Sequence, residues 1–350
     1  MGLAFVLGTR PEIVKVVPVL AELHAMRKRP LICMTGQHTE LARGMPGAKE
    51  FANATSLGLA SDGNVVTYLN RARQAAKAWL KKQQKIRYVV VQGDTMSALA
   101  GAQAASELDI PVAHIEAGVR SHNLADPWPE EQARVTIDGI ADLCLAPTLT
   151  AKQNLLAEGV PQGNIRVTGN TCVSSIKRYT DAVPQEESMA TILITLHRRE
   201  LRESGRVRGV LEALMKITHF ELMAGVAFWL PMHPAMQQYF KELQLPPNFI
   251  LTGPLAYKQM VEGLAGVRGV LTDSGGLVEE AATLGVPTAI LRYANDRPEA
   301  VDAGIARRYN PTPKGVEKAI RALVARDIER KATNCFGNES AAHNVAVELT

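Results

Sequence analysis

Six groups of polar residues in this 350-residue sequence each follow a short hydrophobic run. They are Gly8-Thr9-Arg10, Gly93-Asp94-Thr95, Glu116-Ala117-Gly118, His197-Arg198-Arg199-Glu200, His233 and Asp273-Ser274-Gly275-Gly276. If each run is a strand of a parallel sheet, every group lies at a carboxyl end, which is the edge where open parallel sheets bind ligands. We therefore expect these residues to line one shared crevice.

Three carboxylates near turn signals could move protons: Asp94 in QGDT, Glu116 in HIEAG and Glu130 in PWPEE. Each taken alone is equally well explained as a helix cap or a surface charge. Together on one rim they suit acid–base work, because a crowded and partly buried site raises carboxylate pKa values. His197, at a strand end beside two arginines, is a candidate for stabilising the charge of a departing phosphate, with a core histidine as the alternative.

Two segments could hold an anion. In GTRPEIVK, Pro11 suits the first helical turn and Thr9 can cap it, while Arg10 and Lys15 are unfavourable there unless an anion offsets them. The turn at 274–276 leads into a helix whose free N–H groups favour negative charge. The simpler interpretations are solvated side chains and an ordinary turn. No GxGxxG follows the first strand and no GxxxxGK[ST] occurs, which disfavours nicotinamide and P-loop sites.

The elements that must position these residues are short strands alternating with helical patterns. Strands are expected at 3–7, 30–35, 88–92, 111–115, 142–147 and 165–169, and then at 191–195, 227–232, 248–253, 269–273 and 287–291. The runs are almost continuously apolar, as strands buried on both faces should be. This pattern predicts an α/β protein of two doubly wound parallel-sheet domains, with a boundary near 168–185.

Composition narrows the ligand class. The net charge of +4 and pI near 8.8 suit a small anionic ligand at least as well as nucleic acid. The basic stretch 77–87 is interpreted as a solvated helix end. Four scattered cysteines without CxxC spacing argue against disulfides and zinc. The start of the chain is unlike a signal peptide and no run reaches membrane-spanning length, so we expect a cytoplasmic protein. A nucleotide-sugar fits a crevice that offers cations, two helix N-termini and several carboxylates.

These motifs resemble those of the UDP-N-acetylglucosamine 2-epimerase family. The matching pieces run in family order from residue 8 to residue 304: GTRPEIVK, TGQH, QGDT, HIEAGVRS, PWPEEQAR, VTGNT, LHRRE, PMHP, LTDSGGLVEEAATLGVP and RPEAVDAG. The resemblance implies a GT-B-like fold of two Rossmann-like domains with a crevice between them. It also implies an N-terminal domain over 1–170, joined by a C-terminal helix over 338–350, and a UDP-binding domain over 171–337.

The resemblance further implies a reaction and the residues for it. The enzyme would remove the C2 proton and expel UDP to give 2-acetamidoglucal, then add UDP back with a proton on the opposite face. The implied catalytic residues are Asp94, Glu116, Glu130 and His197. The implied substrate and UDP contacts are Arg10, Lys15, Ser274, Gly275, Gly276, Glu280 and Arg297. Neither cofactor nor metal is implied, and a homodimer is expected, without a nucleic-acid or membrane partner.

Some features depart from the family pattern. After TGQH, the segment LARGMPGAKEF contains Gly44, Pro46 and Gly47, which break helix. A second, activating UDP-N-acetylglucosamine at Gln37 and His233 is therefore in question. The open alternatives are a hydrolysing member that releases ManNAc and UDP, an epimerase of a UDP-diacetamido-uronic acid, a GT-B glycosyltransferase and a nucleotide-sugar sensor.

Overall fold

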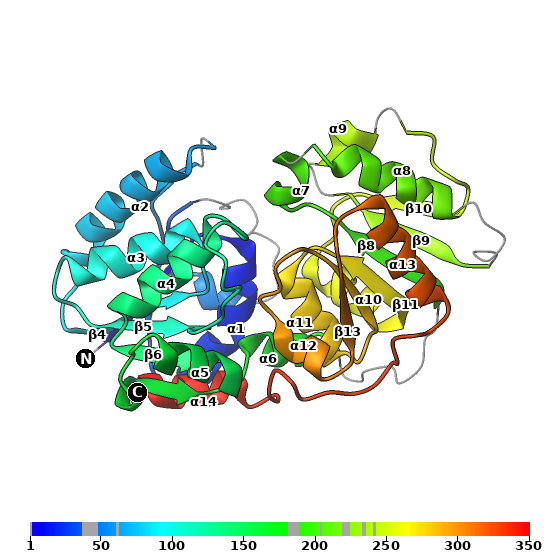
Figure 1. The fold of residues 1–350 in the computed structure, drawn as a ribbon. Coiled ribbons are helices and arrows are strands. Elements are labelled where there is room, and N and C mark those ends of the chain that lie inside the picture. The colour runs from blue at the N-terminus through cyan, green and yellow to red at the C-terminus, as the bar shows by residue number, and fades with distance from the viewer. Residues whose placement is uncertain are drawn as a thin grey trace. The chain divides into compact units, whose positions relative to one another are not determined.

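A computed structural model describes residues 2–36, 48–60, 63–180, 189–203, 205–218, 225–232, 236–240 and 243–350. The chain divides into two compact units, each built on its own sheet (Figure 1). The first unit comprises Met1–Arg178 and Phe336–Thr350, and the second comprises Tyr179–Cys335. The division after Arg178 lies within the region 168–185, and helix α6 (Thr171–Lys177) belongs to the first unit because it packs on α1 and α14.

The first unit contains a parallel sheet with strand order β3-β2-β1-β4-β5-β6-β7. Its strands are β1 (Gly2–Leu7), β2 (Leu31–Met34), β3 (Thr55–Ser56), β4 (Ile86–Gln92), β5 (Val112–Ile115), β6 (Leu143–Ala146) and β7 (Ile165–Val167). The chain begins in the middle of the sheet, so the strand order reverses between β1 and β4, where Phe5 is in register with Val90. Such a reversal point is the usual ligand site of an open α/β sheet.

Helices cover both faces of this sheet. They are α1 (Arg10–Ala25), α2 (Val65–Leu80), α3 (Met96–Ser106), α4 (Glu130–Ile140), α5 (Leu149–Ala157), α6 and α14 (Ala341–Leu349), with short 3-10 turns η2 (Ala48–Phe51) and η3 (Gln162–Asn164). Val89 and Val91 of β4 belong to the core formed with α2, α3 and α4, whereas Val90 between them belongs to the core formed with α1 and α14. Successive side chains of a strand point to opposite faces, so the apolar runs of the sequence are explained by burial on both faces.

The C-terminal segment is part of the first unit. The backbone N–H of Asn170 donates to the Phe336 carbonyl (2.9 Å), and the Asn344 side chain donates to the Thr168 carbonyl (3.1 Å). Val345 and Leu349 of α14 are fully buried in the core that α1 shares. The last helix therefore supports the helix whose N-terminus carries the GTR motif.

The second unit contains a parallel sheet with strand order β10-β9-β8-β11-β12-β13. Its strands are β8 (Met189–Thr195), β9 (Ala227–Pro231), β10 (Phe249–Thr252), β11 (Val267–Thr272), β12 (Thr288–Leu291) and β13 (Ala306–Tyr309). Its helices are α7 (Arg199–Glu203), α8 (Val207–Thr218), α9 (Gln237–Phe240), α10 (Tyr257–Gly266), α11 (Gly275–Thr283), α12 (Pro298–Asp302) and α13 (Pro313–Val324). The strand order again reverses at the first strand, between β8 and β11, where Thr195 is in register with Thr272. The predicted pair of doubly wound parallel sheets is confirmed.

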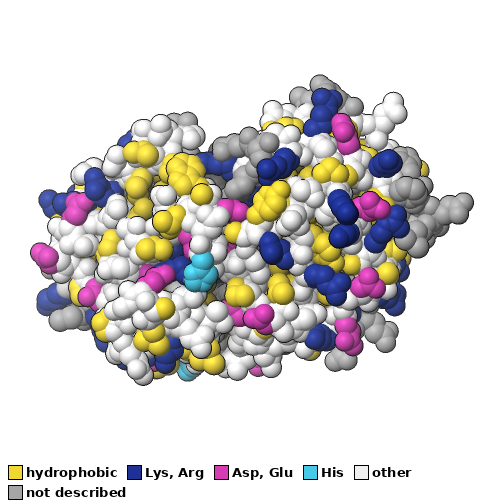
Figure 2. All heavy atoms as spheres, in the orientation of Figure 1, with side chains coloured by type: hydrophobic (Ala, Val, Ile, Leu, Met, Phe, Trp, Pro, Cys, Tyr) yellow, Lys and Arg dark blue, Asp and Glu magenta, His cyan; other side chains and the backbone are white. Residues whose placement is uncertain are grey.

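Surface charges are largely mixed in sign. Lys77, in the basic stretch at the end of α2, pairs with Glu107 at 2.6 Å, and Arg73 pairs with the same carboxylate at 3.2 Å. On the face drawn in Figure 2, Lys and Arg side chains are interspersed with Asp, Glu and apolar ones. Within the described parts of the chain, no helix has the length and apolar character needed to span a membrane.

Candidate active site

The first unit brings three of the predicted motifs to neighbouring strand ends. GTR follows β1, GDT follows β4 and EAG follows β5, and these strands are adjacent in the sheet. Arg10 is the first residue of α1, and Thr9 is its N-cap residue. The predicted shared edge is therefore present within this unit.

Glu116 lies beside Lys15. Lys15 Nζ is 2.5 Å from Glu116 Oε2, and Gln92 Nε2 donates to the same oxygen at 2.6 Å. Glu116 and Lys15 are each 8% exposed. Glu116 also has a left-handed backbone (φ 74°), which is uncommon for a residue with a side chain and is typical of functional sites. The sequence predicted Lys15 as a phosphate contact. In the structure Lys15 pairs with Glu116, which is itself a candidate catalytic residue.

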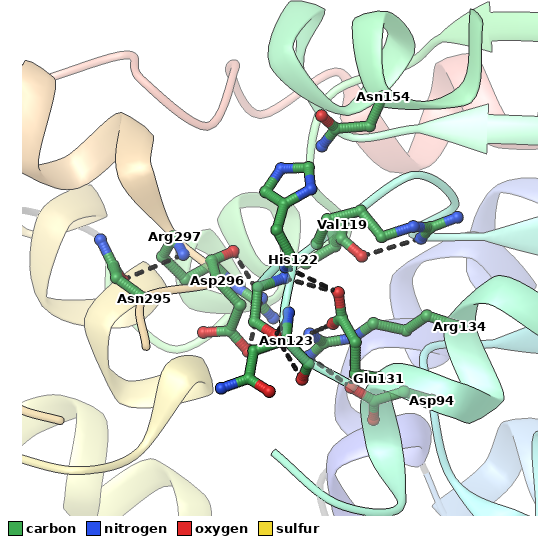
Figure 3. Close-up of polar contacts among 12 residues, drawn as sticks. Asp94, Val119, His122, Asn123, Glu131, Arg134, Asn154, Asn295, Asp296 and Arg297 are labelled. Atoms are coloured by element: carbon green, nitrogen blue, oxygen red, sulfur yellow. Dashed lines mark hydrogen bonds and ion pairs between the residues drawn. The ribbon is translucent and has the colours of Figure 1, made fainter. Parts of the chain in front are cut away.

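Asp94 is held by an arginine that the sequence reasoning missed. Two nitrogens of Arg134 contact Asp94 Oδ2: Nε donates to it at 2.8 Å, and Nη2 is 2.6 Å away (Figure 3). The third nitrogen, Nη1, donates to Glu131 Oε2 at 2.9 Å. Arg134 follows Glu130 by one helical turn of α4, so Asp94 lies against the start of the helix that carries Glu130. The spacing in PWPEEQAR was the signal that could have revealed this contact.

Glu131 anchors the loop before α4. Its Oε1 accepts hydrogen bonds from the backbone N–H groups of Ser121 (2.8 Å) and His122 (2.9 Å), and its side chain is 1% exposed. The sequence named Glu130 as an acid–base candidate and assigned no role to the adjacent Glu131. In the structure Glu131 is the buried anchor, and Glu130 is the more accessible of the two at the helix start.

The start of α1 contains a buried carboxyl group. Glu12 Oε2 accepts hydrogen bonds from the backbone N–H groups of Thr9 (2.6 Å) and Gly8 (3.1 Å), two donors at the helix N-terminus. Burial raises the pKa of Glu12 to about 7, although the hydrogen bonds from Thr9 and Gly8 oppose this rise. Gly8 has no room for a side chain, since a Cβ would lie 1.9 Å from Ser97 Oγ.

In the second unit, Asp273 organises the turn after β8. Its carboxylate accepts the backbone N–H groups of His197 (2.9 Å to Oδ2) and Arg198 (2.8 Å), and His197 Nδ1 is 3.4 Å from Oδ1. Asp273 is 1% exposed, whereas the His197 side chain is 33% exposed. A buried carboxylate at the end of β11 therefore presents a histidine at the end of the adjacent strand β8.

The SGG turn begins α11. Ser274 is the N-cap residue, and its hydroxyl accepts from the Leu277 N–H at 3.5 Å. A Cβ built on Gly276 would meet no atom within 4 Å, and one on Gly275 would approach Asp296 Oδ1 at 3.4 Å. The backbone N–H groups of this first turn have no partner within the helix, and the space over Gly276 lets an anion approach them.

Arg297 belongs to a buried network of four charges. The Nε of Arg297 pairs with Glu279, and its Nη1 is 3.4 Å from Asp296 Oδ2. The Nη1 of Arg292 is 2.6 Å from the other oxygen of the same carboxylate, Asp296 Oδ1. All four residues are 6% exposed or less. Figure 3 shows Arg297 beside Asn295, whose side-chain oxygen accepts the Arg297 N–H. Arg297, which the sequence predicted as a sugar contact, thus has carboxylate partners within its own unit, Glu279 among them.

The predicted residues that the structure describes are divided between the units: Arg10, Lys15, Asp94, Glu116 and Glu130 lie in the first, and His197, Ser274, Gly275, Gly276, Glu280 and Arg297 lie in the second. Gln37 and His233 lie outside the described residues. Among the residues that are described, no group of three or more His, Cys, Asp or Glu could hold a metal ion. Two Rossmann-like domains with polar residues at the carboxyl edges of their sheets define a protein of GT-B-like architecture.

Comparisons with known proteins identify the family within this class. A sequence model described as UDP-N-acetylglucosamine 2-epimerase matches residues 21–350. The chain belongs to the UDP-N-acetylglucosamine 2-epimerase family, whose members are isomerases. It is 31% identical to the UDP-N-acetylglucosamine 2-epimerase of Escherichia coli K12, with 100% of this chain and 98% of that protein covered.

Solved structures agree with this assignment. The crystal structure of the Methanocaldococcus jannaschii UDP-GlcNAc 2-epimerase in complex with UDP-GlcNAc and UDP matches with a TM-score of 0.88 at 31% identity, covering 100% of this chain and 99% of that chain. The Neisseria meningitidis enzyme bound to UDP-GlcNAc matches with a TM-score of 0.87 at 28% identity, covering 100% and 99%. The family predicted from the motifs is confirmed.

Proposed function

We propose that this protein is a non-hydrolysing epimerase that interconverts UDP-GlcNAc and UDP-ManNAc. The observation that carries the proposal is the set of carboxylates at one sheet edge, with Asp94 and Glu116 each beside a buried cation. The family match over residues 21–350 supports the same conclusion. Relatives of 31% and 28% identity have been crystallised with UDP-GlcNAc.

The proposed reaction begins with loss of the C2 proton to a carboxylate. The electron pair of the C2–H bond forms the C1=C2 double bond of 2-acetamidoglucal, while the C1–O bond breaks and its electrons leave with UDP. UDP then adds back at C1, and a proton is delivered to the opposite face of C2. Inversion by this route needs acid–base groups on both faces of the ring, a requirement that Asp94, Glu116 and Glu130 can meet as a set.

The second unit is proposed to hold the nucleotide. The N-terminus of α11, with Ser274, Gly275 and Gly276, would receive the diphosphate, because its N–H groups and helix dipole favour negative charge. His197 would stabilise the charge on the departing UDP. Glu280 would bind the ribose hydroxyls, and Arg10 of the first unit would add a cation for the phosphates.

Proton NMR of the purified protein with UDP-GlcNAc in D2O tests the proposal. UDP-ManNAc carrying deuterium at C2 is the expected product. Free ManNAc and UDP would instead establish the hydrolysing reaction. If the C2 proton of UDP-GlcNAc stays intact, the proposal fails, and the same test with a UDP-diacetamido-uronic acid would identify an epimerase of that sugar.

The homodimer expected from the family resemblance remains part of the proposal. Sedimentation velocity at several protein concentrations, with and without UDP, distinguishes a monomer from a dimer by the sedimentation coefficient. A sedimentation coefficient of a single 350-residue chain at every concentration would contradict it.

A further inference from the structure

A buried histidine and aspartate lie beneath the turns that carry the candidate acid–base groups. His114 Nδ1 is 2.6 Å from Asp138 Oδ1, and His114 Nε2 is 2.8 Å from the Gly93 carbonyl oxygen. His114 is fully buried and Asp138 is 2% exposed. The proposed reaction assigns no role to either residue, and neither carries a predicted site function.

This pair contacts all three elements that present the carboxylates. Gly93, whose carbonyl His114 contacts, immediately precedes Asp94. The Gly118 N–H, two residues after Glu116, donates to Asp138 Oδ2 at 2.9 Å. Asp138 itself is on α4, which begins at Glu130. One buried histidine–aspartate pair therefore links the positions of three otherwise separate carboxylates.

The linked turns have backbones that need such support. Gly93 and Gly118 have φ values of 67° and 80°, and Glu116 has 74°. The Glu116 conformation is costly for a residue with a Cβ and persists only where the surroundings fix it. At Gly118, an added Cβ would lie 2.2 Å from the Ala151 carbonyl oxygen. Small shifts at these turns would move Asp94 and Glu116 directly.

The contacts also define how His114 is held. Nε2 faces a carbonyl oxygen, which only accepts, so Nε2 carries hydrogen. Nδ1 faces Asp138 Oδ1. Although burial opposes ionisation of this carboxyl, its contacts with His114, Arg120 and the Gly118 N–H together hold the pKa of Asp138 below the usual value. Arg120 approaches the other carboxylate oxygen, Oδ2, at 2.7 Å. The ring is therefore fixed at both nitrogens, between Asp138 and the Gly93 turn.

We propose that His114 and Asp138 are positioning residues for the epimerisation, and that this buried pair locks the turns of Asp94 and Glu116 to the helix of Glu130. The inference rests on the proposed function for its kinetic consequence. Its structural content, a buried pair that fixes two turns, can be measured without any turnover.

Two substitutions at His114 separate its contacts. His114→Asn keeps a donor near the Nδ1 position, facing Asp138, and loses the contact with Gly93. His114→Gln keeps a donor near the Nε2 position and loses Asp138. Asp138→Asn keeps the shape and removes the charge. Asp142→Asn is the matched control, because the Asp142 carboxylate accepts the Val112 N–H (2.9 Å) at the other end of the same strand β5.

The kinetic test is the split between kcat and KM. Displacement of reacting groups by about 1 Å costs on the order of a hundredfold in rate. In the His114 and Asp138 variants we expect kcat to fall about a hundredfold, with KM for UDP-GlcNAc and the UDP dissociation constant within about threefold of wild type. Asp142→Asn should keep kcat within about threefold. Folded His114→Asn and Asp138→Asn proteins with wild-type kcat would overturn the inference.

Hydrogen exchange followed by NMR tests the structural content without any turnover. Exchange of the Gly118 N–H, which donates to Asp138, should speed up in Asp138→Asn and not in Asp142→Asn. Equal exchange in the two variants would overturn the inference. If the wild type turns over no UDP-sugar, the proposed function fails and the exchange comparison still decides the inference.

Discussion

The two units have the same sheet architecture and use its carboxyl edge in different ways. In the first unit the edge presents carboxylates, and Asp94 and Glu116 are each held by a cation from a helix, Arg134 or Lys15. In the second unit the carboxylates Asp273 and Glu279 are buried anchors, and the edge presents a histidine and a helix N-terminus. One sheet architecture therefore carries two different sets of polar groups at its carboxyl edge, because the site chemistry depends on the turns and not on the sheet.

Removing a carboxylate from the first unit gives the largest expected effect. Glu116→Gln should lower kcat by about a thousandfold, since acid–base groups contribute on the order of 10² to 10⁴ in rate. UDP affinity should stay near wild type, because UDP is assigned to the second unit. Turnover with UDP-GlcNAc and calorimetric titration with UDP measure the two quantities. Glu107→Gln, at an exposed carboxylate paired with Lys77, is the control, and full activity in Glu116→Gln would remove this residue from the reaction.

Breaking the buried network of the second unit should mainly affect stability. Arg297→Met leaves the Glu279 carboxylate buried beside fewer cations, and loss of one partner of a buried pair costs about 3–5 kcal/mol. The free energy of unfolding of the second unit's transition in urea measures this cost. The double variant Arg297→Met/Glu279→Gln should recover part of it. If Arg297→Met unfolds at the wild-type urea concentration, the network does not stabilise the unit.

Glu12 gives the first unit a stability that depends on pH. Its pKa rises from 4.5 to about 7 on folding, so the folded state binds this proton more tightly than the unfolded state. The resulting stabilisation is fully present below pH 4.5 and is lost as the pH rises through 7. At about 1.4 kcal/mol per unit of pKa, the wild type should lose up to about 3 kcal/mol across this interval relative to Glu12→Gln. Parallel stability curves for the two proteins between these pH values would contradict the shift.

Filling the space over α11 should have the smallest effect and should act on binding alone. A Cβ built on Gly276 would meet no atom within 4 Å, so the fold should tolerate Gly276→Leu. The leucine side chain would keep an anion away from the N-terminus of α11. We expect UDP to bind about tenfold more weakly, which corresponds to roughly 1.4 kcal/mol. Calorimetric titration measures the affinity. Gly209→Leu on α8 is the control within the same unit, and unchanged affinity in Gly276→Leu would move the diphosphate elsewhere.

The sequence was sufficient for the fold and for the identity of the family. Apolar runs such as VVVQ and ILIT predicted strands buried on both faces, and Val89, Val90 and Val91 do alternate between two cores. The motifs at the strand ends predicted Asp94, Glu116 and His197 as neighbours of turns, because strand-end position follows from local pattern alone. The place of α6 in the first unit needed the structure, since a helix is assigned to a unit by what it packs against.

The contacts that give these residues their environments required the tertiary structure. No local pattern pairs Lys15 with Glu116 across 101 positions or His114 with Asp138 across 24. A carboxylate or histidine has the same sequence signal whether it is exposed, ion-paired or an anchor for a backbone N–H, and only its neighbours in space set its charge and orientation. The sequence by itself thus determined two parallel sheets, their polar edges and the family. The structure decided that Glu131, Asp273 and Glu279 are buried anchors, because burial and long-range pairing are properties of the folded chain.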